Sequence, residues 1–270
     1  MFDEYVETFR ELTSEFAVPE GLVIAYIIVG ILIAIMGIAA MVLRLLVFFR
    51  YTKANHTPIK RSMSGIEAAR YALDNSGLQH IKVKKAGFIR EGLFGNYYNV
   101  LTKTIYLRSW LGKIDKRESV TAVALGVQKA ALARLCEEGD AKTKLRGNLS
   151  LIGIFGPMLI VPILIGGSFI DYIFFKSTSI VSTVCLALDG ILLGVGFVVT
   201  FLNIPVEKQA NELALQMLQE YEMADEQELE TIRGVYKAYI LQYIADFILE
   251  VLRLIQWLLE AFIRSKRKDS

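Results

Sequence analysis

The stretch GLVIAYIIVGILIAIMGIAAMVL, residues 21–43, contains 23 residues and no charged side chain. At about 1.5 Å of rise per residue, a helix of this length crosses the roughly 30 Å hydrocarbon core of a bilayer. The preceding residues, 1–20, hold six acids and one arginine, which is unlike the basic start of a cleaved signal peptide. The sequence therefore predicts a retained transmembrane anchor over 21–49, with 1–20 as an extracytoplasmic segment.

The composition agrees with a membrane protein, because 54% of the 270 residues are hydrophobic and the mean hydropathy is +0.42. Two further apolar runs, near 149–175 and 179–204, are joined by a connection too short for a domain. They predict a transmembrane hairpin over 149–204. Asp189 lies near the middle of the second run, where an ionised carboxylate is costly. It is either a functional group or a neutral, hydrogen-bonded side chain that faces another helix.

Charge predicts the orientation of the chain. Residues 50–149 hold 19 Lys and Arg against 8 Asp and Glu, so the positive-inside rule places the domain 50–148 in the cytoplasm. The segment 205–230 then returns to the same side as a cytoplasmic helical segment. We expect a multi-pass protein of the bacterial plasma membrane. Anionic lipids are the expected partners of the basic domain and nucleic acid is not, because no basic motif interleaved with aromatic residues is present.

The domain 50–148 has the pattern of a compact α+β unit. Ser64 and Glu67 have the spacing of a capping box that opens a helix through residue 73, and Asn-Ser-Gly at 75–77 closes it. HIKVKK, at 80–85, alternates as a half-buried strand does, and 97–107 predicts one or two more strands. The run 118–135 is strongly helical. We therefore expect a membrane α+β fold with an anchor, this domain and the hairpin.

The last segment, 231–270, predicts an amphipathic helix with a basic tail. Its polar side chains recur at spacings of three, four and seven residues, which places them on one narrow stripe of a helix. We expect a helix that lies along the inner membrane surface or against the cytoplasmic domain, with Trp257 at the headgroups. A fourth membrane span is the alternative.

The stretch NIPVEKQAN, at 203–211, places Glu207 directly after the second hairpin run. Pro205 suits the first turn of a helix, where an acidic side chain is favoured by unpaired N–H groups. A solvated helix start is therefore one interpretation of Glu207. A second interpretation comes from a family resemblance.

The chain resembles the YugP-like membrane zinc metallopeptidases over nearly its whole length. The resemblance rests on SGIEAARYALDNSGLQHIKV at 64–83, TIYLR at 104–108, GILL at 190–193 and Pro-Val-Glu-x-x-Ala at 205–210. It implies that 50–148 is a metallopeptidase-like domain. In that family the Ala-rich helix carries HExxH, in which two His bind zinc and the Glu activates water. The Glu after Pro-Val is implied as the third ligand.

In this chain, all three functional positions of the HExxH motif hold other residues. The place of the first His holds Gln128, that of the Glu holds Lys129 and that of the second His holds Leu132. Of the implied metal ligands only Glu207 remains. The family's Asp-His-Tyr-Asp-Pro segment falls on residues 95–99 and keeps only Tyr97. The two histidines and the two cysteines supply no matched ligand pair, so we expect no metal and no other cofactor.

The resemblance and its departures predict a pseudopeptidase, a metallopeptidase-like membrane protein that binds, scaffolds or regulates without hydrolysis. Its implied partners are other membrane proteins, an active paralogue or a second copy in a homo-oligomer. Two alternatives stay open at this point: a non-zinc or residual hydrolase, and a subunit of a transport assembly that uses Asp189. If Glu207 has lost its metal, desolvation requires a new charge partner. We predict an ion pair in which the Lys129 ammonium lies within about 4 Å of Glu207.

Overall fold

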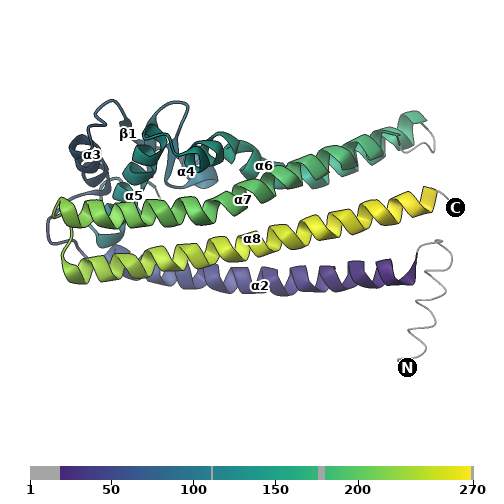
Figure 1. The fold of residues 1–270 in the computed structure, drawn as a ribbon, viewed down its shortest axis with the longest axis horizontal. Helices are drawn as coiled ribbons and strands as arrows, with labels where there is room; N and C mark the ends of the chain where they lie inside the picture. Colours follow the sequence, from purple (N-terminus) through teal and green to yellow (C-terminus); the bar gives the residue numbers. More distant parts are fainter. Residues whose placement is uncertain (1–18, 111, 176–179, 269–270) are drawn as a thin grey trace, which may run out of the picture. The chain divides into compact units, whose positions relative to one another are not determined.

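The computed structural model describes residues 19–110, 112–175 and 180–268. Figure 1 follows the elements along the chain from α2 to α8. They divide into two compact units: the described residues of the first are 19–40, 151–175, 180–200 and 245–268, and those of the second are 41–110, 112–150 and 201–244. The predicted extracytoplasmic segment lies almost wholly outside the described residues. The fold is mostly helical with one small sheet, as the sequence predicted.

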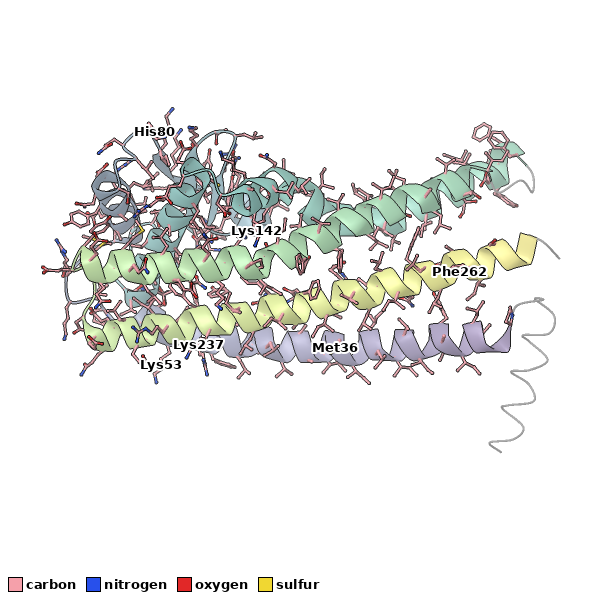
Figure 2. All side chains as sticks on the ribbon, viewed as in Figure 1. Met36, Lys53, His80, Lys142, Lys237 and Phe262 are labelled. Atoms are coloured by element: carbon pink, nitrogen blue, oxygen red, sulfur yellow. The ribbon has the colours of Figure 1, made fainter. Side chains whose placement is uncertain are left out.

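Three helices in the described part of the chain are long and apolar enough to cross a membrane. Their bounds are Gly21–His56, Met158–Phe175 and Ile180–Glu220. Large apolar side chains such as Ile31 and Phe49 are more than half exposed along them. Figure 2 shows carbon side chains around Met36 and a nitrogen-tipped one at Lys53, further along the same helix. Apolar surface of this extent is characteristic of contact with lipid, so the fold indicates membrane association.

The helices at these spans are longer than the apolar runs. They are α2 (Glu20–His56), α6 (Ala141–Ile170) followed by the short π-helix η1 (Asp171–Phe175), and α7 (Ile180–Glu220). At about 1.5 Å per residue α7 is about 60 Å long, twice the hydrocarbon thickness. Its polar part, from Asn203 onward, therefore extends past the apolar run.

Pro205 lies inside α7, so the interpretation of Glu207 as the start of a helix is wrong. A proline within a helix removes one hydrogen bond and crowds the preceding turn. Here packing offsets that cost, because Val206, Ala210 and Ala214 are completely buried on the following turns. The helix continues through the proline and presents Glu207 from its interior.

The sheet has the strand order β1-β3-β2. Strand β1 (Lys82–Ala86) pairs in parallel with β3 (Thr104–Arg108), and β2 (Tyr97–Asn99) pairs antiparallel with β3. The short helix α4 (Phe88–Phe94), which the sequence pattern did not predict, connects β1 with β2. The two predicted strand regions are confirmed, with small shifts at their ends.

Helices α3 (Gly65–Asn75) and α5 (Val120–Glu137) form the centre of the second unit. The predicted capping box is confirmed, since Ser64 and Glu67 exchange both hydrogen bonds. A Cβ on Gly126 would collide with the Gly65 carbonyl oxygen, so the two backbones touch at these glycines. The core around this contact includes Ile105 from the sheet and Met217 from α7. This packing fixes the face that α5 turns toward α7.

The first unit has its own contacts between apolar helices. A Cβ on Gly153 would crowd Val199, so α6 and α7 approach closely there. Helix α8 (Glu226–Lys268) contributes its residues from 245 onward to this unit. The Trp257 indole N–H donates to the Leu186 carbonyl oxygen at 3.3 Å. The predicted C-terminal helix is thus present, and it packs against the apolar helices. Its depth in a membrane stays a prediction.

Candidate functional site: a buried carboxylate cluster

The site begins with one face of α7. Asn203, Glu207 and Asn211 recur every four residues and therefore lie one above the other on the helix. The turn from Glu207 to Asn211 is buried, with Glu207 at 1% exposure and Asn211 at 5%. A stripe of amide, carboxylate and amide thus faces the interior of the second unit.

Glu207 is held by hydrogen bonds from two other helices. From α6, the Arg146 guanidinium donates through Nη2 to Oε1 at 2.5 Å and through Nε to Asn203 Oδ1 at 2.7 Å. From α5, Gln128 Nε2 donates to Glu207 Oε2 at 2.7 Å and to Asn211 Oδ1 at 2.6 Å. Each carboxylate oxygen therefore has a donor, which is how a buried charge is tolerated.

Lys129 contributes a second cation. Its Nζ lies 3.9 Å from Glu207 Oε1, at the outer edge of the predicted contact distance, and its side chain is 9% exposed. Arg146 is closer to the same oxygen, and its side chain is 22% exposed. The main ionic partner of Glu207 is therefore Arg146, which was not predicted from the sequence.

The charges in the cluster shift its protonation equilibria. Burial opposes ionisation of Glu207, but the charges of Lys129 and Arg146, with the hydrogen bonds from Arg146 and Gln128, outweigh it and lower the pKa of the carboxyl. Burial lowers the pKa of the Lys129 ammonium. Arg146 lowers it further, and Glu207 offsets only part of this change. The arrangement stabilises a carboxylate at Glu207.

Leu132, on α5, stands at the position that the resemblance assigns to the second His of the motif. It is 3% exposed and packs with Leu135, Val206 and Ala210 in a small apolar cluster. The polar side of the site, Gln128 and Lys129, and its apolar side thus come from successive turns of one helix. Leu132 offers no donor or acceptor to Glu207.

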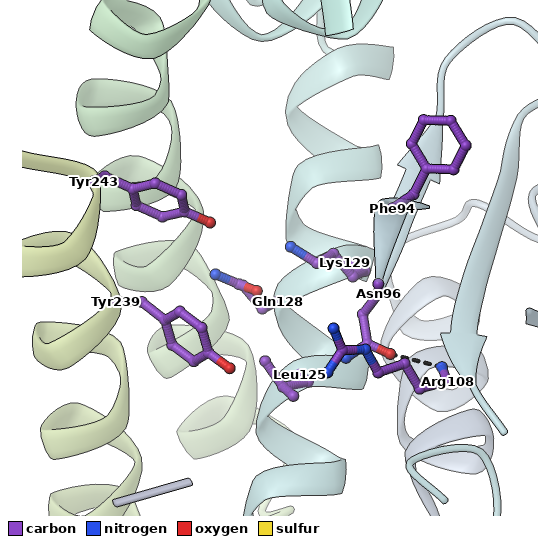
Figure 3. Close-up of a pocket in the computed structure, with 9 residues that line it drawn as sticks. Phe94, Asn96, Arg108, Leu125, Gln128, Lys129, Tyr239 and Tyr243 are labelled. Carbon is purple, nitrogen blue, oxygen red and sulfur yellow. Dashed lines mark hydrogen bonds between the residues drawn. The ribbon is translucent and has the colours of Figure 1, made fainter. Parts of the chain in front are cut away.

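A cavity of about 200 Å³ adjoins Gln128 and Lys129 within the second unit. Its other lining residues are Phe94, Gly95, Asn96, Arg108, Leu125, Tyr239 and Tyr243. Figure 3 shows the Tyr239 and Tyr243 rings extending from α8 toward the side chains of α5. Gly95 and Asn96 belong to the segment 95–99 that the resemblance singled out. Tyr97, the residue retained there, stacks on Tyr106 and does not line the cavity.

Neither histidine joins the cluster. His56 is exposed and its Nδ1 lies 3.2 Å from the Arg117 guanidinium. His80 is exposed and its Nε2 lies 3.3 Å from Glu137 Oε2.

Asp189, in the first unit, is completely buried, and neither of its carboxyl oxygens has a hydrogen-bond partner among the described residues.

Comparison with protein families identifies the family of this chain. The family model described as "Putative neutral zinc metallopeptidase" matches residues 25–262. The chain belongs to this family. The match covers the domain, the hairpin and most of α8, in agreement with the resemblance noted in the sequence. Comparisons with curated proteins and with solved structures give no match.

The family implies a zinc ion, and the donor atoms of this cluster decide whether its residues suit one. Zinc sites in proteins use His, Cys and carboxylate ligands. At the implied ligand positions stand an amide, an aliphatic side chain and one carboxylate, Glu207, which already binds Arg146. Among the described residues, no group of three or more His, Cys, Asp or Glu side chains is placed to hold a metal. The donor set does not fit the ion.

Three members of the cluster, Arg146, Asn203 and Asn211, were not predicted from the sequence. A signal for the two asparagines was available, because their spacing from Glu207 is four residues on each side. Arg146 had no such signal, since it is 61 residues from Glu207 and comes from a different helix.

Proposed function

We propose that this chain is a membrane pseudopeptidase: a member of the metallopeptidase family that binds a partner and does not hydrolyse it. The observation that carries the proposal is the binding of Glu207 by Arg146 and Gln128. A cation and an amide from the protein satisfy the carboxylate that the family resemblance implies as a metal ligand. The proposed roles are binding, scaffolding or regulation in the membrane.

The chemistry of the substituted positions supports this proposal. A general base must accept a proton from water, and the HExxH position for that role holds Lys129. The competing enzyme function is a residual hydrolase in which Lys129 is the base, since burial lowers its pKa toward the neutral amine. Against this alternative, the charge of Arg146 is already neutralised by Glu207 and is not free to stabilise a developing oxyanion.

The proposed partner is another membrane protein. The large exposed apolar surface of α2 and α7 supports contact with lipid or with apolar helices, including a second copy or an active paralogue. We infer that the second unit lies in the cytoplasm, because its segment 50–149 has a strong excess of basic residues. Cysteine labelling at residue 113 in intact cells and in inverted vesicles tests this orientation. Labelling from outside would contradict it.

The pseudopeptidase proposal is tested by metal analysis together with a proteolysis assay on the purified full chain. We expect far less than one zinc per chain and no cleavage of a casein or peptide-library substrate. Stoichiometric zinc that survives mild chelation, or cleavage above that of a Lys129→Met control, would contradict the proposal.

A restoration experiment makes this test sharper. The triple variant Gln128→His, Lys129→Glu and Leu132→His rebuilds the family motif on α5. We expect it to bind zinc, and to bind more tightly when Arg146→Ala also frees Glu207. The matched control adds Glu207→Gln, which should remove the gain. If the triple variant binds no more zinc than the wild type, the interpretation of these positions as a degenerate zinc site is wrong.

A further inference from the structure

Two basic side chains line the cavity beside the cluster, and none of its described lining residues is acidic. Arg108, from β3, and Lys129, from α5, are its charged side chains, and no Asp or Glu of the described chain lines it. A cavity of about 200 Å³ is also much larger than the about 30 Å³ that one water occupies. Its polar donors therefore surround a space that can hold a small organic group.

Both cations have unused hydrogen-bonding capacity. The Arg108 guanidinium lies beside the Tyr51 hydroxyl, but its buried Nε has no hydrogen-bond partner among the described residues. Within the part of the chain that the structure describes, the one acidic contact of the Lys129 ammonium is Glu207 Oε1 at 3.9 Å, and Arg146 binds that same oxygen more closely. A buried donor without a partner costs free energy, so an acceptor in this space would be stabilising.

The other lining groups indicate what the acceptor is attached to. Phe94 and Leu125 supply apolar surface, and Tyr239 and Tyr243 supply rings with hydroxyl groups. Figure 3 shows these tyrosines on the opposite side of the space from Lys129 and Arg108. A planar carboxylate suits a guanidinium in a way that a water or chloride does not. The apolar side suits a carbon chain next to that carboxylate.

We propose that this cavity binds an organic carboxylate, with Arg108 and Lys129 as its binding cations. The carboxylate can come from the C-terminus of a peptide or from a free small acid. The inference rests on the proposed function and deepens it, because a chain that does not cut a peptide can still retain its end. An anion beside Lys129 also favours the ammonium form, as Glu207 does.

The test uses the purified full chain in detergent at pH 7 and isothermal titration with four probes. These are acetyl-Ala-Ala-Leu with a free carboxylate, the same peptide as its C-terminal amide, acetyl-leucine and inorganic phosphate. We expect the free-acid peptide to bind at least about tenfold more tightly than its amide, the change given by one charge-assisted hydrogen bond. Acetyl-leucine that binds as tightly as the peptide identifies a free acid as the source, whereas weaker binding identifies a peptide end.

Variants connect the binding to the cavity. Arg108→Gln should weaken the free-acid peptide at least about tenfold and leave the Glu207 cluster unchanged. Lys129→Met should weaken binding of the free-acid peptide by a similar factor. Thermal unfolding checks that each variant is folded. Arg134→Gln, on the exposed side of α5 where Arg134 pairs with Glu138, is the matched control and should bind as the wild type does.

Several outcomes would overturn the inference. Equal binding of acid and amide, tighter binding of phosphate than of any carboxylate, or full affinity in Arg108→Gln would each do so. Absence of binding with no metal and no proteolysis would contradict this inference and leave the pseudopeptidase proposal intact. Cleavage of the bound peptide would contradict the pseudopeptidase proposal and leave the cavity assignment intact.

Discussion

Glu207 and Asp189 are both buried carboxyl groups on α7, yet their surroundings are opposite. Glu207, in the second unit, receives hydrogen bonds from Arg146 and Gln128 and has Lys129 nearby. Asp189, in the first unit, has no hydrogen-bond partner for either oxygen among the described residues. Burial alone therefore does not define a site. The donors and cations around a buried carboxyl decide whether its anion is stabilised, as they do at Glu207.

The largest effect is expected from removing the anion of the cluster. Glu207→Gln leaves Lys129 and Arg146 without their counterion, and breaking a buried ion pair costs about 3–5 kcal/mol. We therefore expect a large fall in the thermal unfolding temperature in detergent. The double variant Glu207→Gln with Arg146→Gln should recover part of the loss. Small and additive effects would show that the cluster is not a coupled network.

A smaller effect is expected from removing each cation, and the two cations should differ. Arg146 lies 2.5 Å from Glu207 and Lys129 lies 3.9 Å away, so the coupling energy with Glu207 should be larger for Arg146. Lys129→Met should cost about 1 kcal/mol or less, because Arg146 and Gln128 still satisfy the carboxylate. Double-mutant cycles measure both couplings. A larger coupling for Lys129 would reverse our ranking of the partners.

The protonation of the cluster predicts a pH dependence with two parts. The pKa of Glu207 is lowered in the folded state, so its contribution to stability is present above the ordinary glutamate pKa of 4.5 and is lost as the pH falls through the folded pKa. The pKa of Lys129 is also lowered, so the unfolded chain binds more protons between the folded pKa and the ordinary lysine pKa of 10.5. Stability therefore rises with pH over that range.

Unfolding of the wild type and of Lys129→Met across about pH 3–11 checks both parts, because this window brackets both ordinary pKa values. The alkaline rise should be absent in Lys129→Met, and the acidic loss should be reduced in Glu207→Gln. Identical alkaline profiles for the wild type and Lys129→Met would show that Lys129 does not titrate in that range.

The smallest effect is expected at Asp189. Asp189→Asn keeps the size of the side chain and removes no hydrogen bond to the described residues, so stability should change by less than about 1 kcal/mol. The matched comparison is Glu207→Gln on the same helix. A loss of several kcal/mol of unfolding free energy in Asp189→Asn would indicate an ionic partner for Asp189. Asp189 would then resemble Glu207 as a carboxylate held by charge.

Asp189 also provides the test of the transport alternative. Proteoliposomes with the wild type and with Asp189→Asn can be compared for proton and cation flux. Flux that depends on Asp189 would favour a transport function, because an ionisable group within an apolar helix is characteristic of ion and proton pathways.

Much of the local structure could be predicted from the sequence. Three local predictions are confirmed: a helix over the apolar run 21–43, a capping box at Ser64 and a helix near 118–135. Each could be predicted because it depends on residues within a few turns of one another. Pro205 is where local reasoning was wrong. Its intrinsic preference is for the first turn of a helix, and the burial of the residues after it keeps α7 continuous instead.

The residues of the site also divide into those that were singled out from the sequence and those that only the fold brings together. The family resemblance implied that Gln128, Lys129 and Leu132 stand at the HExxH positions and that Glu207 is the third ligand position, and this assignment stays a prediction. Only the tertiary structure could bring Arg146 to Glu207 and Arg108 to the cavity beside Lys129. Those contacts join separate helices and a strand across many residues. Their distances depend on how the backbones pack, as at Gly65 and Gly126, and not on any local pattern.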